Sequence, residues 1–156
     1  MIRRQLGREP RGLRRVAVRC PYGAPAVLEQ EPYLPSGQPF PTTYHLSCPY
    51  AVGRVSALEA AGGIARYERL VAAGGEISDS YHRGAELQRS LRRPAAVMFD
   101  GGASLSTGIA GTVRDGAVKC LHAHIAFALA HPDYALGGRA AEEAAPLFPA
   151  TECCSA

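Results

Sequence analysis

The stretch from Lys119 to His124 concentrates the residue types of this chain that could do chemistry. It holds the only lysine of the sequence, one cysteine and two histidines, which can serve as metal ligands or acid/base groups. If the stretch is helical, Cys120 and His124 share one face because they are four residues apart, whereas His122 points elsewhere. The spacing predicts a ligand pair or an acid/base pair and does not specify a reaction.

The surrounding segment predicts a helix over residues 117–130, which His131-Pro132 would end. In its first turn, the positive end of the helix dipole and the ammonium of Lys119 would favour the thiolate of Cys120. A thiolate can be a nucleophile or a metal ligand, with His124 as second ligand or general base and His122 as the alternative. On so apolar a helix, however, a small cysteine and a hydrogen-bonded histidine are also ordinary core residues.

The other cysteines extend the metal interpretation, because two of them end predicted strands directly before a proline. Four thiolates from different parts of the chain would suit zinc or an iron–sulfur cluster, with a histidine as the substitute ligand. The sequence has no local CxxC pair, so the fold would have to assemble the site. The candidate metal ligands are Cys20, Cys48, Cys120, His124, Cys153 and Cys154.

An enzyme is the alternative, with Lys119, Cys120 and His122 as the candidate catalytic residues. Residues 99–116 are rich in glycine and precede the predicted helix, a common arrangement for binding an anion at unpaired amide groups. Gly108 and Gly111 are the candidate cofactor-binding positions of this segment. The acidic residues near glycine loops or helix starts are interpreted as caps and surface groups; they are Asp100, Asp115, Glu142 and Glu143.

Length and composition predict one domain over residues 1–156. With 47% hydrophobic and 20% charged residues, 156 residues can bury a core without disulfides. No apolar run approaches the ~20 residues of a membrane span, and no signal peptide is apparent, so we expect a cytoplasmic protein without membrane insertion. In a reducing cytosol, an odd number of cysteines also argues against a disulfide framework.

The charge is unevenly distributed along the chain. The first 19 residues carry seven arginines and one glutamate, so they contribute +6 to a total of +3, and the remainder is mildly acidic. A basic N-terminal arm, about residues 1–14, could bind nucleic acid or a protein partner. It could equally be a solvated face, because no aromatic residue is interleaved to stack on bases.

The fold class predicted from periodicity and turn residues is α+β, with a small antiparallel sheet of about three strands packed against several helices. The strands are expected at 15–20, 26–31 and 42–48, the first two joined by a turn at 20–25. A flexible C-terminal tail is expected at about 147–156. The helices are expected at 49–61, 64–73, 78–93, 117–130 and 139–145.

Several short motifs, taken in order, resemble a bacterial family known as domain of unknown function family 501. They are Gln5–Arg8, Pro10–Gly12, Arg19–Pro21, Cys48-Pro49, Ser56 with Leu58-Glu59, and, as the most specific, Val118–His122. The resemblance implies an intracellular, often actinobacterial protein and supplies no reaction. A cysteine near the C-terminus is also similar to the family pattern, which favours a role for Cys153 or Cys154. Thr43–His45 and Tyr134–Gly137 depart from the pattern.

Overall fold

Three short strands form an antiparallel sheet in the order β1-β2-β3. They are β1 (Leu13–Arg19), β2 (Pro25–Gln30) and β3 (Tyr44–Leu46). The predicted turn between the first two is present, with the Cys20 amide donating to the Ala24 carbonyl at 2.8 Å. β3 is shorter than predicted, because Cys48 is already the residue that precedes the next helix.

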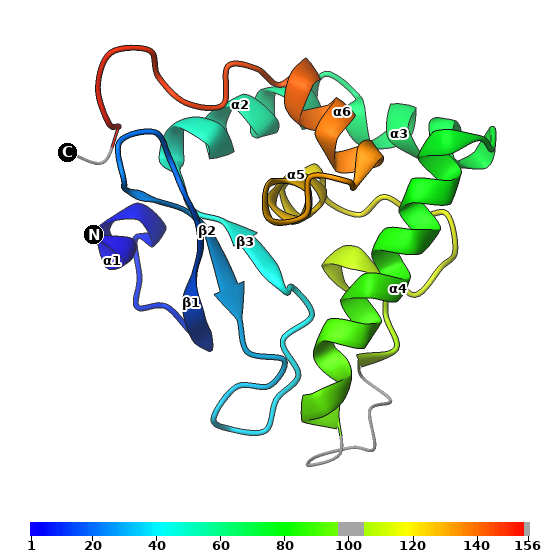
Figure 1. The fold of residues 1–156 in the computed structure, drawn as a ribbon, viewed down its shortest axis with the longest axis horizontal. Helices are drawn as coiled ribbons and strands as arrows, with labels where there is room; N and C mark the ends of the chain where they lie inside the picture. The colour runs from blue at the N-terminus through cyan, green and yellow to red at the C-terminus, as the bar shows by residue number, and fades with distance from the viewer. Residues whose placement is uncertain (97–104, 155–156) are drawn as a thin grey trace.

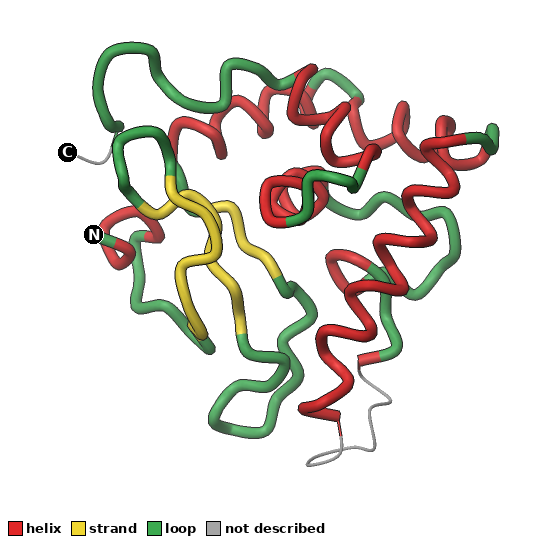
Figure 2. Tube along the Cα trace, viewed as in Figure 1, coloured by secondary structure: helices red, strands yellow, loops and turns green. Residues whose placement is uncertain are grey.

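Helices cover this sheet in the computed structural model, which describes residues 1–96 and 105–154 (Figures 1 and 2). The predicted α+β class is therefore confirmed. The helices are α1 (Ile2–Leu6), α2 (Pro49–Ala60), α3 (Gly63–Ala72), α4 (Glu76–Ala96), α5 (Leu121–Ala130) and α6 (Ala135–Glu143), with a 3-10 turn, η2 (Ile109–Gly111), before α5. Among the described residues, none of these helices has the length and apolar character needed to cross a bilayer.

Helix α5 lies at the centre of the molecule, between the sheet and the helices α2, α4 and α6 (Figure 1). Its sequence is apolar on nearly every side, and Leu121, Ile125 and Phe127 are each at most 1% exposed. A helix without a polar face is stable only when neighbours surround it. Neighbouring helices and strands therefore surround α5 and fix the position of its first turn.

The start of α5 differs from the prediction. Residue Cys120 has an extended backbone, with φ −159° and ψ 115°, and precedes the helix instead of lying in its first turn. The prediction of helix from residue 117 is wrong, and Cys120 and His124 therefore do not share a helix face. A residue that directly precedes a helix usually has an extended backbone, and its side chain turns back toward the first turn. The side chain of Cys120 therefore does not follow the helical spacing that the prediction assumed.

Helix α6 begins four residues earlier than predicted, and two glycines lie inside it. A β-carbon on Gly137 would overlap the backbone carbonyl of His124 and would lie 2.8 Å from the methyl group of Ala128. Glycine is therefore needed where α6 crosses α5 closely. Gly138, the next residue, has no atom within 4 Å of such a β-carbon.

Both ends of the chain contact the body of the molecule. In the N-terminal arm, the Gln5 amide donates to the Pro25 carbonyl at 2.9 Å. After α6, the chain runs back past α2 toward the turn between β1 and β2 (Figure 1), where the Tyr22 hydroxyl donates to the Pro149 carbonyl at 2.7 Å. Leu147, Phe148 and Cys153 are partly buried against the core. The described part of the predicted tail is therefore packed on the domain.

Candidate functional site

Three side chains that can bind a metal meet where α2 ends and α5 begins. Glu59 lies in the last turn of α2, Cys120 precedes α5, and His122 lies in its first turn. One ligand atom from each lies within 4.8 Å of the other two. The His122 Nδ1 atom is 3.2 Å from Glu59 Oε1 and 3.8 Å from Cys120 Sγ. A nitrogen, an oxygen and a sulfur thus converge on one small volume.

Glu59 is held in place by the backbone of α5. Its Oε1 atom accepts the Leu121 amide hydrogen at 2.6 Å, so the carboxylate satisfies one of the amides that a helix start leaves unpaired. The negative charge is also stabilised by the positive end of the helix dipole. A carboxylate of the protein itself thus occupies one amide that this helix start offers to an anion.

The ring of His122 has a fixed orientation with different surroundings for its two nitrogens. Nε2 lies 3.2 Å from the Val52 carbonyl oxygen and 3.2 Å from the Ser56 hydroxyl. A carbonyl oxygen only accepts hydrogen bonds, so Nε2 carries a proton and donates it. In a neutral ring, Nδ1 then presents a lone pair to the Glu59 carboxylate, which is also an acceptor. This contact requires a cation between the two atoms, either a proton or a metal ion.

The pKa of His122 agrees with this requirement. The contact with Cys120, and next the charge of Glu59, raise its pKa to about 9 although partial burial opposes the shift. A proton therefore stays on the ring at neutral pH when no metal replaces it.

A cavity of about 590 Å³ lies beside the three groups, and Cys120 and His122 are part of its wall. Lys119 and His45 also line it, and most of the remaining surface comes from apolar side chains such as Leu46 and Val52. None of the described lining residues is an aspartate or a glutamate. The cavity is therefore suited to a small molecule that combines an apolar part with negative charge.

Residues 16–142 match the family model of the "Protein of unknown function (DUF501)" family. The chain belongs to this family. The match includes all three groups of the site and ends before Cys153 and Cys154. No curated protein and no solved structure matches the chain.

The cysteines of the DUF501 chain do not gather as a set of four. Within residues 1–96 and 105–154, the one group of three or more potential ligands that lie together is Glu59, Cys120 and His122. Cys48 instead contacts Cys154, with 3.4 Å between the two sulfur atoms. Cys20 is buried in the hydrophobic core. Of the predicted cysteine ligands, Cys120 thus belongs to the mixed site, Cys48 and Cys154 form a pair, and Cys20 lies in the core. Cys153 is partly buried against the core.

His124 points into the interior of the domain and not toward Cys120. Its side chain is fully buried, and its ring is stacked between those of Tyr81 and Tyr134. The Tyr134 hydroxyl lies 2.6 Å from Nδ1. Burial lowers the pKa of His124 to about 3, so the ring stays neutral. His124 thus has the environment of a core residue.

The glycines predicted to bind an anion use their backbone amides within a turn. The amide of Gly108 donates to the Thr112 carbonyl at 2.8 Å, and that of Gly111 donates to the Gly108 carbonyl at 3.0 Å. A β-carbon on Gly111 would lie 2.6 Å from Pro41. Close packing therefore accounts for glycine at these positions. Asp100 and the glycines at 101 and 102 lie outside the described residues.

Two residues of the site, Ser56 and Glu59, were not among the predicted ligands. The available signal was their spacing on α2, where Val52, Ser56 and Glu59 recur every three to four residues and so share one helix face. Both also belong to one of the family motifs. The acidic residues that the sequence singles out lie near glycine loops or helix starts, whereas Glu59 lies in the last turn of a helix.

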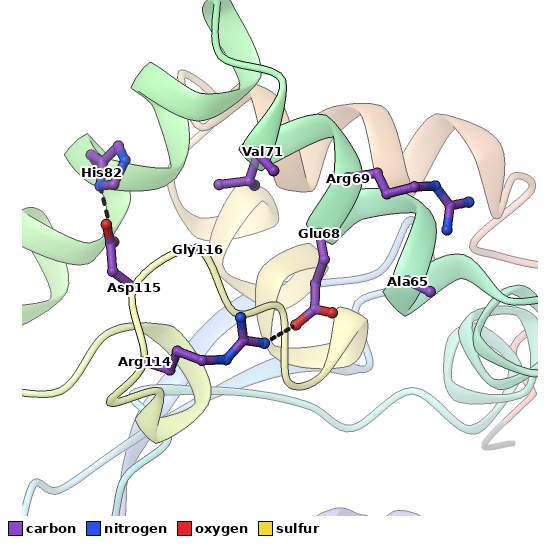
Figure 3. Close-up of a pocket in the computed structure, with 9 residues that line it drawn as sticks. Ala65, Glu68, Arg69, Val71, His82, Arg114, Asp115 and Gly116 are labelled. Atoms are coloured by element: carbon purple, nitrogen blue, oxygen red, sulfur yellow. Dashed lines mark hydrogen bonds and ion pairs between the residues drawn. The ribbon is translucent and has the colours of Figure 1, made fainter.

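A second cleft, of about 550 Å³, lies between α3, α4 and the loop before α5 (Figure 3). Two pairs of side chains line it: Arg114 contacts Glu68 at 2.8 Å, and Asp115 lies 3.6 Å from His82. Glu68 also accepts the Val118 amide hydrogen. These pairs connect the loop to the helices. The site formed by Glu59, Cys120 and His122 therefore has more specific chemistry than this cleft.

Proposed function

We propose that this DUF501 protein binds a zinc ion through Glu59, Cys120 and His122 and exposes it to the adjacent cavity. The observation that carries the proposal is the environment of His122. Its Nε2 atom donates a hydrogen bond to the Val52 carbonyl. Its other nitrogen faces a carboxylate and a thiol, and a divalent cation would satisfy all three groups at once.

The ligand types and their spacing support zinc. Zinc binds cysteine sulfur, histidine nitrogen and carboxylate oxygen, and tetrahedral zinc bonds of ~2.0–2.3 Å separate neighbouring ligand atoms of these types by roughly 3.3–3.6 Å. The distances of 3.2 and 3.8 Å from His122 Nδ1 are close to these values. A metal-binding histidine usually donates its other nitrogen to a backbone carbonyl, as His122 does. Iron–sulfur clusters are held mainly by several cysteines, so a site with one cysteine favours zinc.

Three protein ligands leave a fourth position for water or substrate, which is typical of catalytic zinc. Zinc lowers the pKa of bound water and so generates a nucleophile at neutral pH. Lys119 would attract a negatively charged substrate, and the apolar wall would receive its uncharged part. Metal-dependent hydrolysis of a small organic anion is the reaction class that these features favour.

Metal analysis of the purified protein tests this proposal. We expect about one zinc per chain after growth in zinc-containing medium, and less than about 0.1 in Glu59→Gln, Cys120→Ser and His122→Gln, because three ligands are needed for tight binding. Cys153→Ser is the matched control and should retain its zinc. A wild-type protein with less than about 0.1 zinc, and no uptake when zinc is added, would contradict the proposal.

A thiol-dependent enzyme is the second candidate, and the contact between Cys120 Sγ and His122 Nδ1 favours it. A histidinium next to a cysteine stabilises the reactive thiolate. This candidate predicts that iodoacetamide labels Cys120 faster than the other cysteines at neutral pH in metal-free protein, and that His122→Gln removes the difference. Equal, slow labelling of all five cysteines would exclude it.

A further inference from the structure

Cys48 and Cys154 are in contact, although 106 positions separate them in the sequence. Their sulfur atoms lie 3.4 Å apart. Cys48 directly precedes α2 and is 2% exposed, whereas Cys154 is exposed. Neither cysteine belongs to the site formed by Glu59, Cys120 and His122.

The contact is one of several that hold the segment after α6 against the domain. At its start, Arg54 donates to the Ala144 carbonyl at 3.0 Å and to the Ala145 carbonyl at 2.7 Å. Further along, Tyr22 donates to the Pro149 carbonyl. The segment thus follows α2 back toward the β1–β2 turn (Figure 1), and Cys154 reaches Cys48 at the end of this path.

We propose that Cys48 and Cys154 are a site of reversible disulfide formation, with hydrogen peroxide as the oxidant, and that the bond ties the C-terminal segment to the start of α2. A disulfide bond is about 2.05 Å long, so the sulfur atoms must approach by roughly 1.4 Å. Cys48 is enclosed by the core, whereas Cys154 is exposed, so Cys154 makes most of the movement.

The difference in exposure sets the order of the steps. The Cys154 thiolate attacks one oxygen of the peroxide, the O–O bond breaks, and the departing hydroxide takes up a proton to become water. Cys154 is then a sulfenic acid. Cys48 sulfur attacks the Cys154 sulfur, the S–O bond breaks, and the hydroxide leaves as water with the proton of Cys48. The two sulfurs lose two electrons in total, which reduce one peroxide to two waters.

Cys48 is not suited to the first step, and its contact with Cys154 places it for the second. Burial raises its pKa to about 11, and the neighbouring Cys154 adds to the shift, so Cys48 remains a thiol at neutral pH. Its position also connects the bond to the zinc site, because Val52, Ser56 and Glu59 follow Cys48 along the same helix. A bond here would fix the start of the helix that carries those residues.

Peroxide treatment of the full chain tests this inference. Wild type, Cys48→Ser, Cys154→Ser and the matched control Cys153→Ser are exposed to a slight excess of peroxide, and the remaining thiols are then alkylated. Mass spectrometry should find a Cys48–Cys154 linked peptide in the wild type and in Cys153→Ser, and in neither of the other two. A reductant should restore both thiols. Oxidation should also raise the melting temperature of the wild type but not of Cys154→Ser, because the bond closes a long loop of the unfolded chain.

Two results would overturn the inference: linkage of Cys153 in place of Cys154, or oxidation of Cys154 to a sulfonic acid while Cys48 stays reduced. The experiment is repeated in Cys120→Ser, which lacks a proposed zinc ligand. Linkage in that variant shows that the cysteine pair acts independently of zinc, so a failure of the zinc proposal leaves this result unaffected.

Discussion

At the scale of single residues, the two histidines of α5 have opposite environments although one residue separates them. His122 is half-buried, and its nitrogens contact Glu59, Cys120 and Val52, which raise its pKa. His124 is fully buried between two tyrosine rings, and desolvation lowers its pKa. Two positions of the same helical turn thus differ, because His122 lies among potential metal ligands and His124 packs in the core.

Substitution of each histidine in turn should distinguish its effect on zinc binding from its effect on stability. His124→Ala should lower the free energy of unfolding by about 2–4 kcal/mol, because it leaves a cavity and removes the partner of the Tyr134 hydroxyl. It should leave the zinc content of the folded protein unchanged. His122→Ala should remove the zinc and, in metal-free protein, cost less stability than His124→Ala. Urea unfolding and metal analysis measure both effects. Loss of zinc in folded His124→Ala would contradict this assignment.

At the scale of secondary structure, the elements were predictable and their ends were less so. Proline in the first turn of α2 and the glycines after the helix indicate its limits, and the three strands follow from alternation and turn residues. The start of α5 was missed because Cys120 has no capping side chain that marks a boundary. The position of this helix start determines which residues form the site, because it places the Cys120 side chain next to His122 and away from His124. The partner Glu59 depends on a contact across 63 positions, which local patterns do not predict.

Two adjacent glycines of α6 give a matched test of how closely it packs on α5. Gly137→Ala should destabilise the protein by about 1–3 kcal/mol, because its methyl group would overlap the backbone of α5. Gly138→Ala should stabilise it by up to about 1 kcal/mol, because that position has space and alanine favours the helix. Thermal unfolding of both variants measures the difference. Equal effects would mean that α6 does not cross α5 at Gly137.

At the scale of the whole molecule, the basic charge predicted for the first 19 residues, which include the N-terminal arm and β1, is partly neutralised by the fold. Glu9 pairs with Arg3 at 3.0 Å, and Glu29 pairs with Arg14 at 3.2 Å and with Arg15 at 2.6 Å. The sequence predicts the excess of arginine but not these pairs, because the register of β1 and β2 brings Glu29 beside the two arginines. The exposed arginines that pair with no carboxylate in the described part of the chain include Arg8, Arg11 and Arg19.

If the arm and β1 together bind a polyanion such as nucleic acid, these three arginines should contribute most of the affinity. Replacing Arg8, Arg11 and Arg19 together by glutamine should lower the salt concentration at which the protein elutes from heparin. Replacing Arg3, Arg14 and Arg15 removes the same net charge and should have a smaller effect, because their carboxylate partners already oppose contact with phosphate or sulfate groups. Equal shifts for the two variants would show that net charge alone controls retention. Wild-type protein that flows through heparin at low salt would exclude the arm as a polyanion-binding surface.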